Sequence, residues 1–327
     1  MRRTLRNIIS GLLPLLLAGA AQAQQGIQFT QYAFSGLSVN PAYAGYKENW
    51  TMNLISRIQW TGIDGAPRTG AVSVDGVTDA DYKNTGLGFV VTGDMLGPQT
   101  TSSAYVNYAY RLRLNDDDTK RICFGLGAGA NAYVVDYGKL SSTDPGDPGL
   151  AAGSVSKFTP DFRLGIYYYS PSFYLGLSAL NLLADAGFSD NAAVVREARC
   201  YYLTVGYMTP ISDAIDWKPS LLIKEDMRGP TNIDLSTNFL INKMFWIGGT
   251  YRTGVPEWSK SALQNNLNHI DAGAAIVEYY VSPNLRLGYS FDFNINKLAG
   301  YSNGTHEFSL GMSFGRRKER VINPRYF

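Results

Sequence analysis

The segment NLRLGYSFDFN, residues 284–294, alternates strictly between apolar side chains and polar or small ones. The apolar positions are Leu285, Leu287, Tyr289, Phe291 and Phe293, and the positions between them are Arg286, Gly288, Ser290, Asp292 and Asn294. A period of two is typical of a β-strand, because successive side chains of a strand point to opposite faces. The strand would therefore have one entirely apolar face, and what lies against that face decides the fold.

The same alternation recurs along the chain. Clear examples are residues 49–60, 103–114, 161–169, 231–242 and 305–314. Further strands are expected at about 69–77, 86–95, 119–135, 172–182, 198–208, 217–227, 244–254 and 270–281. Together these segments predict an all-β chain of about fourteen antiparallel strands, each of about ten residues.

Composition decides which side of the strands meets water. A soluble sandwich buries its apolar faces, whereas an outer-membrane barrel turns them toward lipid and lines its lumen with polar ones. Only 17% of the residues are charged, where about 25% is usual for a soluble domain. The polar faces carry Gly, Ser, Asn and Tyr with isolated Arg and Asp, and the composition therefore favours a membrane barrel. The net charge is only +2, whereas a nucleic-acid-binding protein is usually strongly basic, so the composition argues against nucleic acid as a partner.

The connections between the expected strands alternate in length. With the N-terminus in the periplasm, the outward connections are 61–68, 96–102, 136–160, 183–197, 228–230, 255–269 and 295–304. The inward ones are 78–85, 115–118, 170–171, 209–216, 243 and 282–283. Long loops on one side and short turns on the other are typical of bacterial outer-membrane barrels. A barrel of about fourteen strands encloses more space than its own side chains fill, so we expect a partly plugged lumen.

The two ends of the chain suggest its division. Residues 1–23 combine basic residues, an apolar core and an Ala-Gln-Ala site, as in a cleaved Sec-type signal peptide. Residues 24–48 are expected to form a plug or a periplasmic segment, and the outer loops are expected to help fill the lumen. Residues 49–315 would form the barrel, and residues 316–327 a basic periplasmic tail. The protein is thus expected in the outer membrane of a Gram-negative bacterium.

Charged residues on the polar faces would line the lumen. They are Arg57, Arg111, Arg113, Asp161, Arg163, Arg252, Arg286 and Asp292. Rings of charge can make a channel selective, but both signs occur, which favours pairing with one another or with the plug. Cys123 and Cys200 are the only cysteines, and the sequence leaves open whether they form a disulfide.

Two segments outside the strands are candidates for contact with partners. The turn NPAYAG offers Asn40, Pro41, Tyr43 and Gly45, either as an ordered turn before the first strand or as a plug or docking element. The tail offers Arg316, Arg317 and Pro324, either in a disordered extension or in a docking segment.

The sequence gives little support to catalysis. The chain has two histidines, His269 and His306. His306 precedes Glu307, and adjacent residues of a strand point to opposite faces, so these two do not share a site as a base and its orienting acid. We therefore expect no enzyme activity, no metal site and no cofactor.

Five segments resemble the PorP/SprF family, whose members are outer-membrane proteins of the type IX secretion system. They are residues 29–45, 57–76, 159–183, 251–254 and 289–314. The resemblance implies a barrel that binds translocon or periplasmic ring components, or a secreted adhesin with a C-terminal signal domain, in surface attachment and gliding motility. It leaves open which of these roles applies. The alternative function is a porin for small solutes.

Overall fold

The computed structural model describes residues 26–79, 81–139, 153–184, 198–227, 229–255, 270–295 and 297–314. The strands are β1 (Trp50–Ile58), β2 (Arg68–Val77), β3 (Thr85–Leu96), β4 (Gln99–Arg113), β5 (Arg121–Asp136), β6 (Ser154–Tyr169), β7 (Phe173–Leu180), β8 (Cys200–Tyr207), β9 (Thr209–Ser212), β10 (Ile215–Glu225), β11 (Thr231–Ile241), β12 (Phe245–Val255), β13 (Ile270–Ser282), β14 (Leu285–Asn294) and β15 (Thr305–Phe314). Within these residues no helix is both long and apolar enough to span a membrane.

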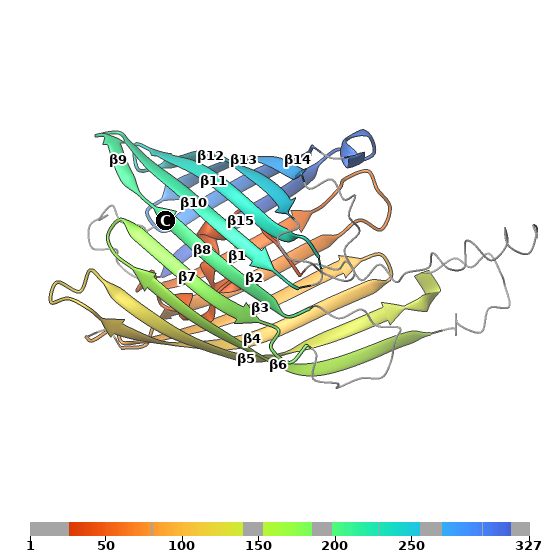
Figure 1. The fold of residues 1–327 in the computed structure, drawn as a ribbon, viewed down its shortest axis with the longest axis horizontal. Coiled ribbons are helices and arrows are strands. Elements are labelled where there is room, and N and C mark those ends of the chain that lie inside the picture. Colours follow the sequence, from red (N-terminus) through yellow and green to blue (C-terminus); the bar gives the residue numbers. More distant parts are fainter. Residues whose placement is uncertain are drawn as a thin grey trace, which may run out of the picture.

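The strands form one closed antiparallel sheet (Figure 1). Each strand pairs with its neighbours in sequence, and β15 returns to pair with β1, from Trp50 opposite Phe314 to Ile58 opposite His306. β8 and β9 pair with successive parts of β10 and are separated only by Met208, so they act as one barrel strand. The barrel therefore has fourteen strands, as predicted, and the alternation of the sequence runs around the whole wall.

Side chains on the wall are sorted as a membrane barrel requires. In β14, Leu287 and Phe293 are 46% and 48% exposed on the outside, whereas Arg286 and Asp292 are buried inside. The same holds in β4, where Val106 is exposed and Asn107 is fully buried. Apolar residues outside and polar residues inside invert the pattern of a soluble sandwich, so the apolar faces lie against lipid.

The strand boundaries differ from the prediction where pairing extends into expected loops. β6 begins at Ser154 because it pairs with β5 up to Asp136, which shortens the expected loop 136–160. β3 and β4 likewise pair to Leu96 and Gln99, which leaves a two-residue turn instead of the expected loop 96–102. The lengths of these strands and loops are set by pairing between strands, and this pairing cannot be read from the sequence of one segment alone.

The N-terminal segment, residues 26–48, lies inside the barrel (Figure 1). It forms three short 3₁₀ turns, at Tyr32–Phe34, Gly36–Ser38 and Pro41–Tyr43. It begins near the long-loop end, where β14 connects to β15, and leaves at the short-turn end, beside the β2–β3 turn. The buried apolar clusters of the molecule form mainly between this segment and the inner wall.

Cys123 and Cys200 are both buried in the wall, and no disulfide joins them.

Candidate functional site: the occupied lumen

The N-terminal segment is anchored at the long-loop end by a buried charge cluster. Arg57 of β1 donates from its two terminal nitrogens to Asp292 at 2.7 Å and to Glu307 at 2.8 Å. The backbone N–H groups of Thr30 and Gln31 donate to the two oxygens of Glu307 at 3.0 and 2.8 Å. The Thr30 hydroxyl donates to Asp292 and accepts from Arg57 at 2.9 Å. One arginine and two carboxylates of the wall thus hold the backbone and a side chain of the segment at once.

A second set of contacts extends this anchor around the wall. Arg252 of β12 pairs with Asp234 of β11 through two nitrogens, at 2.9 Å each. Gln28 donates to the same carboxylate at 3.0 Å. Lys224 of β10 donates to the carbonyl of Gly26. The start of the described chain is therefore attached to two neighbouring strands, β10 and β11, by charge-assisted hydrogen bonds, which are the stronger kind.

The NPAYAG turn is fixed against the opposite side of the wall. The Asn40 side chain caps the turn by accepting from the N–H of Ala42 at 2.9 Å, as asparagine often does at a helix start. Its amide nitrogen donates to the carbonyls of Ile166 and Leu177 at 3.0 and 3.2 Å. Pro41 follows at the first helical position, where its missing N–H costs no hydrogen bond. One asparagine thereby ties the turn to β6 and β7.

Glycines in the wall give the turn its space. A Cβ on Gly125 of β5 would lie 2.1 Å from the nitrogen of Ala42, and one on Gly165 of β6 would lie 2.1 Å from the Asn40 oxygen. A Cβ on Gly86 of β3 would lie 2.0 Å from the carbonyl oxygen of Ala44. Such contacts are too short for any side chain, so the backbone of the segment approaches the wall where the wall has no side chains.

Tyrosines pack around the same turn. Tyr43 and Tyr46 of the segment meet Tyr167 of β6 edge to face, with ring centroids 5.6 and 5.3 Å apart. Burial raises the pKa of Tyr43 well above its usual value. Burial also raises the pKa of Tyr32 to about 12, although its hydrogen bonds to serines of the wall act in the opposite direction. These hydroxyls therefore remain protonated across the physiological range of pH.

At the short-turn end, where the segment leaves the lumen, an ion pair joins it to the wall. Glu48 pairs with Lys83 of the β2–β3 turn at 2.7 Å. The backbone of that turn is held in place by Arg111 and Arg121, which donate to the Lys83 carbonyl at 3.0 and 2.9 Å. Arg121 also pairs with Asp118 at 2.6 Å. The turn and the exit of the N-terminal segment thus form one connected unit.

The structure buries most of the charged residues that the sequence places in the lumen. Arg57, Arg111, Asp161, Arg163, Arg252, Arg286 and Asp292 have buried or nearly buried side chains with partners. Arg113 differs, because it lies at the end of β4 and is exposed. The partners are other wall residues and residues of the N-terminal segment.

The residues singled out for partner contact divide into two groups. Asn40, Pro41, Tyr43 and Gly45 are buried inside the barrel, and so the structure gives them no surface for an outside partner. Arg316, Arg317 and Pro324 lie outside the described residues.

Several residues that hold the lumen together were not predicted from the sequence. They are Asp75, Lys218, Lys224, Asp234, Glu278 and Glu307. Each lies on a strand at a position whose side chain points inward, so the alternation that identified Arg57 was also the signal for these. Glu307 was considered only for catalysis. It points inward, while His306 lies on the outer face, 2.8 Å from the hydroxyl of Tyr289.

Several solved outer-membrane barrels are similar to the chain at low identity. The Acinetobacter baumannii outer membrane protein Omp33 has 10% identity and a TM-score of 0.44, covering 82% of this chain and 98% of that one. The CymD monoaromatic hydrocarbon channel has 12% identity and a TM-score of 0.49, with coverages of 86% and 93%. A Pseudomonas aeruginosa FadL homologue has 11% identity and a TM-score of 0.45, with coverages of 87% and 94%. At these identities none of them informs function.

No curated protein matches the chain. A family model does, over residues 21–312, and its description is type IX secretion system membrane protein PorP/SprF. The match covers nearly all of the closed wall and the segment within it. The chain therefore belongs to the PorP/SprF family of type IX secretion system membrane proteins and is an integral outer-membrane β-barrel.

Proposed function

We propose that the protein is a non-enzymatic component of type IX secretion, which binds protein partners at the ends of a barrel whose lumen is plugged. The observation that carries this proposal is the N-terminal segment, which is bonded to the wall from Thr30 at one end to Glu48 at the other. A barrel built for diffusion keeps an aqueous channel. The contacts of the N-terminal segment with the inner wall support a plugged lumen, and partners would then bind at the two rims.

The rims carry exposed aromatic and apolar side chains on which partners can dock. At the long-loop end Tyr301 is 79% exposed and Phe158 is 71% exposed. At the short-turn end Tyr82 is 73% exposed and Ile211 is 59% exposed. Tyrosine is enriched among the residues that dominate binding energy at protein interfaces. Because long loops face outward in bacterial barrels, the first pair would face the cell exterior and the second pair the periplasm.

The two rims would take different partners. The outer rim suits a secreted protein that stays at the surface, such as an adhesin with a C-terminal signal domain. The periplasmic rim suits components of the translocon or of the periplasmic ring. The signal peptide expected in residues 1–23 and the docking role of the basic tail belong to the same proposal, as does a contribution to gliding motility.

The test compares two rim variants, Tyr82→Ser and Tyr301→Ser, in cells that lack the native gene. Tagged protein is purified from native membranes, and co-purifying proteins are identified by mass spectrometry. We expect Tyr82→Ser to reduce the amount of co-purified periplasmic partner about tenfold and to leave the amount of co-purified surface protein unchanged. Tyr301→Ser should reduce the surface protein about tenfold and leave the periplasmic partner unchanged. Each variant is thus the control for the other. Normal surface display of every type IX substrate in the deletion strain would contradict the proposal.

A diffusion channel is the rival function, and conductance separates the two. Purified full-length protein in a planar bilayer should show no large, steady open conductance if the N-terminal segment and the outer loops plug the lumen. Steady channels of uniform size from the full-length protein would favour the porin.

A further inference from the structure

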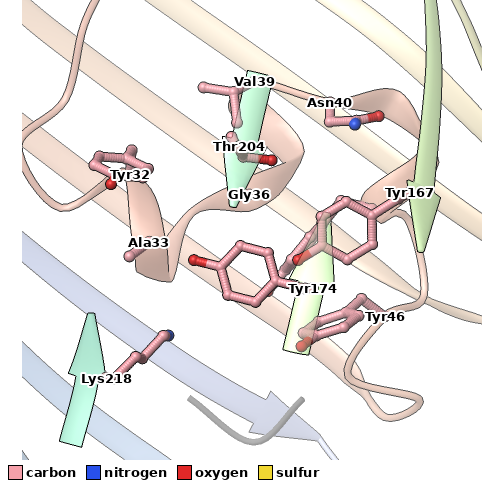
Figure 2. A pocket seen from close by; sticks show the side chains of 11 residues that line it. Tyr32, Ala33, Gly36, Val39, Asn40, Tyr46, Tyr167, Tyr174, Thr204 and Lys218 are labelled. Atoms are coloured by element: carbon pink, nitrogen blue, oxygen red, sulfur yellow. The ribbon is translucent and has the colours of Figure 1, made fainter. Parts of the chain in front are cut away.

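A small cavity lies inside the barrel between the 3₁₀ turns of the N-terminal segment and the inner faces of β6, β7 and β10. Its lining includes Tyr32, Tyr43, Tyr174 and Lys218. Tyr32, Tyr174 and Lys218 are labelled in Figure 2. The volume open to the centre of a water molecule is about 20 Å³. One water needs roughly 10–15 Å³ by this measure. The cavity therefore holds a water or two, or one small ion.

Lys218 places a positive charge at this cavity. The side chain is 1% exposed, and Figure 2 shows it directed from β10 toward the tyrosines. Its nitrogen lies 5.0 Å from the ring centroid of Phe34 and 5.6 Å from that of Trp246. Aromatic faces attract a cation but do not neutralise it. Among the described residues, none accepts a hydrogen bond from this nitrogen or forms an ion pair with it.

One carboxylate is shared between Lys218 and a second buried cation, so the group keeps an excess of positive charge. The nearby carboxylate, Glu278, contacts Arg286 at 3.2 Å, and both are buried. Arg286 keeps one terminal nitrogen that is buried without a hydrogen-bond partner. A buried charge without a counter-charge is costly, and structures normally supply a partner for it.

A second donor group in the cavity lining, a hydroxyl of the N-terminal segment, also lacks a partner among the described residues. Tyr43 lines the cavity, and its hydroxyl oxygen is buried and makes no hydrogen bond within the described part of the chain. A protonated tyrosine donates one hydrogen bond. Lysine and tyrosine together thus offer two kinds of donor to one small space, and this donor set fits an anion.

We propose that a monovalent anion of about the size of chloride binds in this cavity, between the ammonium group of Lys218 and the hydroxyl of Tyr43. The anion neutralises Lys218 and bridges β10 to the N-terminal segment. It therefore adds a contact between β10 and the Pro41–Tyr43 turn, far along the segment from the anchor at Thr30. Bulky anions are excluded by the size of the cavity.

Bromide provides the test, because it resembles chloride in size and quenches tryptophan fluorescence. Trp246 is fully buried and lies beside Lys218. Purified full-length protein is titrated with bromide in a buffer whose other anion is gluconate, and the emission that is lost in Trp246→Phe is followed. We expect saturable quenching that chloride reverses by competition. Quenching that is absent, or that rises linearly without saturation, would overturn the proposal.

Two lysines of β10 make a matched comparison. Lys218 and Lys224 are both 1% exposed, but Lys224 donates to the carbonyl of Gly26 and lies outside the cavity. Lys218→Met should weaken bromide binding by at least about tenfold, because a hydrogen bond from a charged group is lost. Lys224→Met loosens the anchor at Gly26 but keeps the donors that line the cavity, so it should weaken bromide binding much less than Lys218→Met does. Equal binding by wild type and Lys218→Met would contradict the assignment.

A crystallographic measurement needs no variant and remains decisive if Lys218→Met does not fold. Crystals of the wild-type protein soaked in bromide should show an anomalous peak in the cavity within hydrogen-bond distance of the Lys218 nitrogen. A cavity with water density alone would exclude the anion.

Discussion

At the scale of single residues, the lumen depends on a few charged side chains that do two tasks at once. Arg57 neutralises Asp292 and Glu307 and also donates to the hydroxyl of Thr30. Its side chain is 3% exposed, so solvent screens these contacts very little. The removal of one partner from such a cluster leaves the others charged and buried, which costs more than the contact itself contributes.

The first prediction concerns this arginine. Arg57→Met should destabilise the folded barrel by about 3–5 kcal/mol, because two buried carboxylates lose their cation. It should also expose the start of the N-terminal segment to protease. Thermal unfolding in detergent and limited proteolysis measure the two effects.

Arg113→Met is the control for Arg57→Met, since Arg113 is exposed at the end of β4. Its effect should stay within about 0.5 kcal/mol, as for most surface substitutions. Equal melting temperatures for the two variants would show that the buried cluster does not stabilise the protein.

At the scale of elements, the structure depends on how closely the Pro41–Tyr43 turn approaches the strands of the wall. Strand glycines usually weaken a sheet, because glycine loses more conformational entropy on folding than other residues and has no side chain to pack. Here Gly125 and Gly165 compensate by letting the turn touch the strand backbone. Gly125 is the first residue of the small-residue run GLGAGA, 125–130, and it is the one that the turn meets.

The second prediction separates this role from the general effect of glycine. Gly125→Val should destabilise the barrel by about 1–3 kcal/mol and loosen the turn, because the new side chain overlaps Ala42. Gly93→Val is the control, since a Cβ there meets nothing within 4 Å. It should be neutral or slightly stabilising. Chemical denaturation of both variants measures the difference, and equal effects would rule out a spacing role for Gly125.

At the scale of the whole molecule, the closed wall and the segment inside it are distinct structures with distinct sources of stability. The wall satisfies its backbone by pairing strand with strand until β15 meets β1, which a lipid environment demands. The segment is held by side chains and by contact with glycines. The two can therefore be separated by experiment.

The third prediction follows from this separation. Deletion of residues 26–48 should leave a barrel that inserts into membranes but conducts ions steadily, since its polar inner face then meets water. Single-channel recordings of the deletion and the full-length protein measure this. A deletion variant that inserts and stays silent would mean that other parts of the chain close the lumen.

The alternation of apolar and polar residues within each strand was sufficient to predict the strands of the barrel wall and which of their faces meets lipid. The period of two in residues such as Leu285 to Asn294 assigned the strands, and the low charge content assigned lipid to their apolar faces. The ends of β6 and the existence of β9 were not predictable in this way, because they depend on which residues the neighbouring strands pair with.

What the sequence by itself determined is therefore the direction in which each wall residue points, since that follows from local backbone geometry alone. Which inward residues meet was decided only by the tertiary structure. Arg57 and Asp292 are 235 positions apart and meet because closure of the sheet places β1 next to β15 and one strand away from β14. The placement of the N-terminal segment against Glu307 and Gly125 has the same origin, because only a closed wall brings those two residues around one lumen.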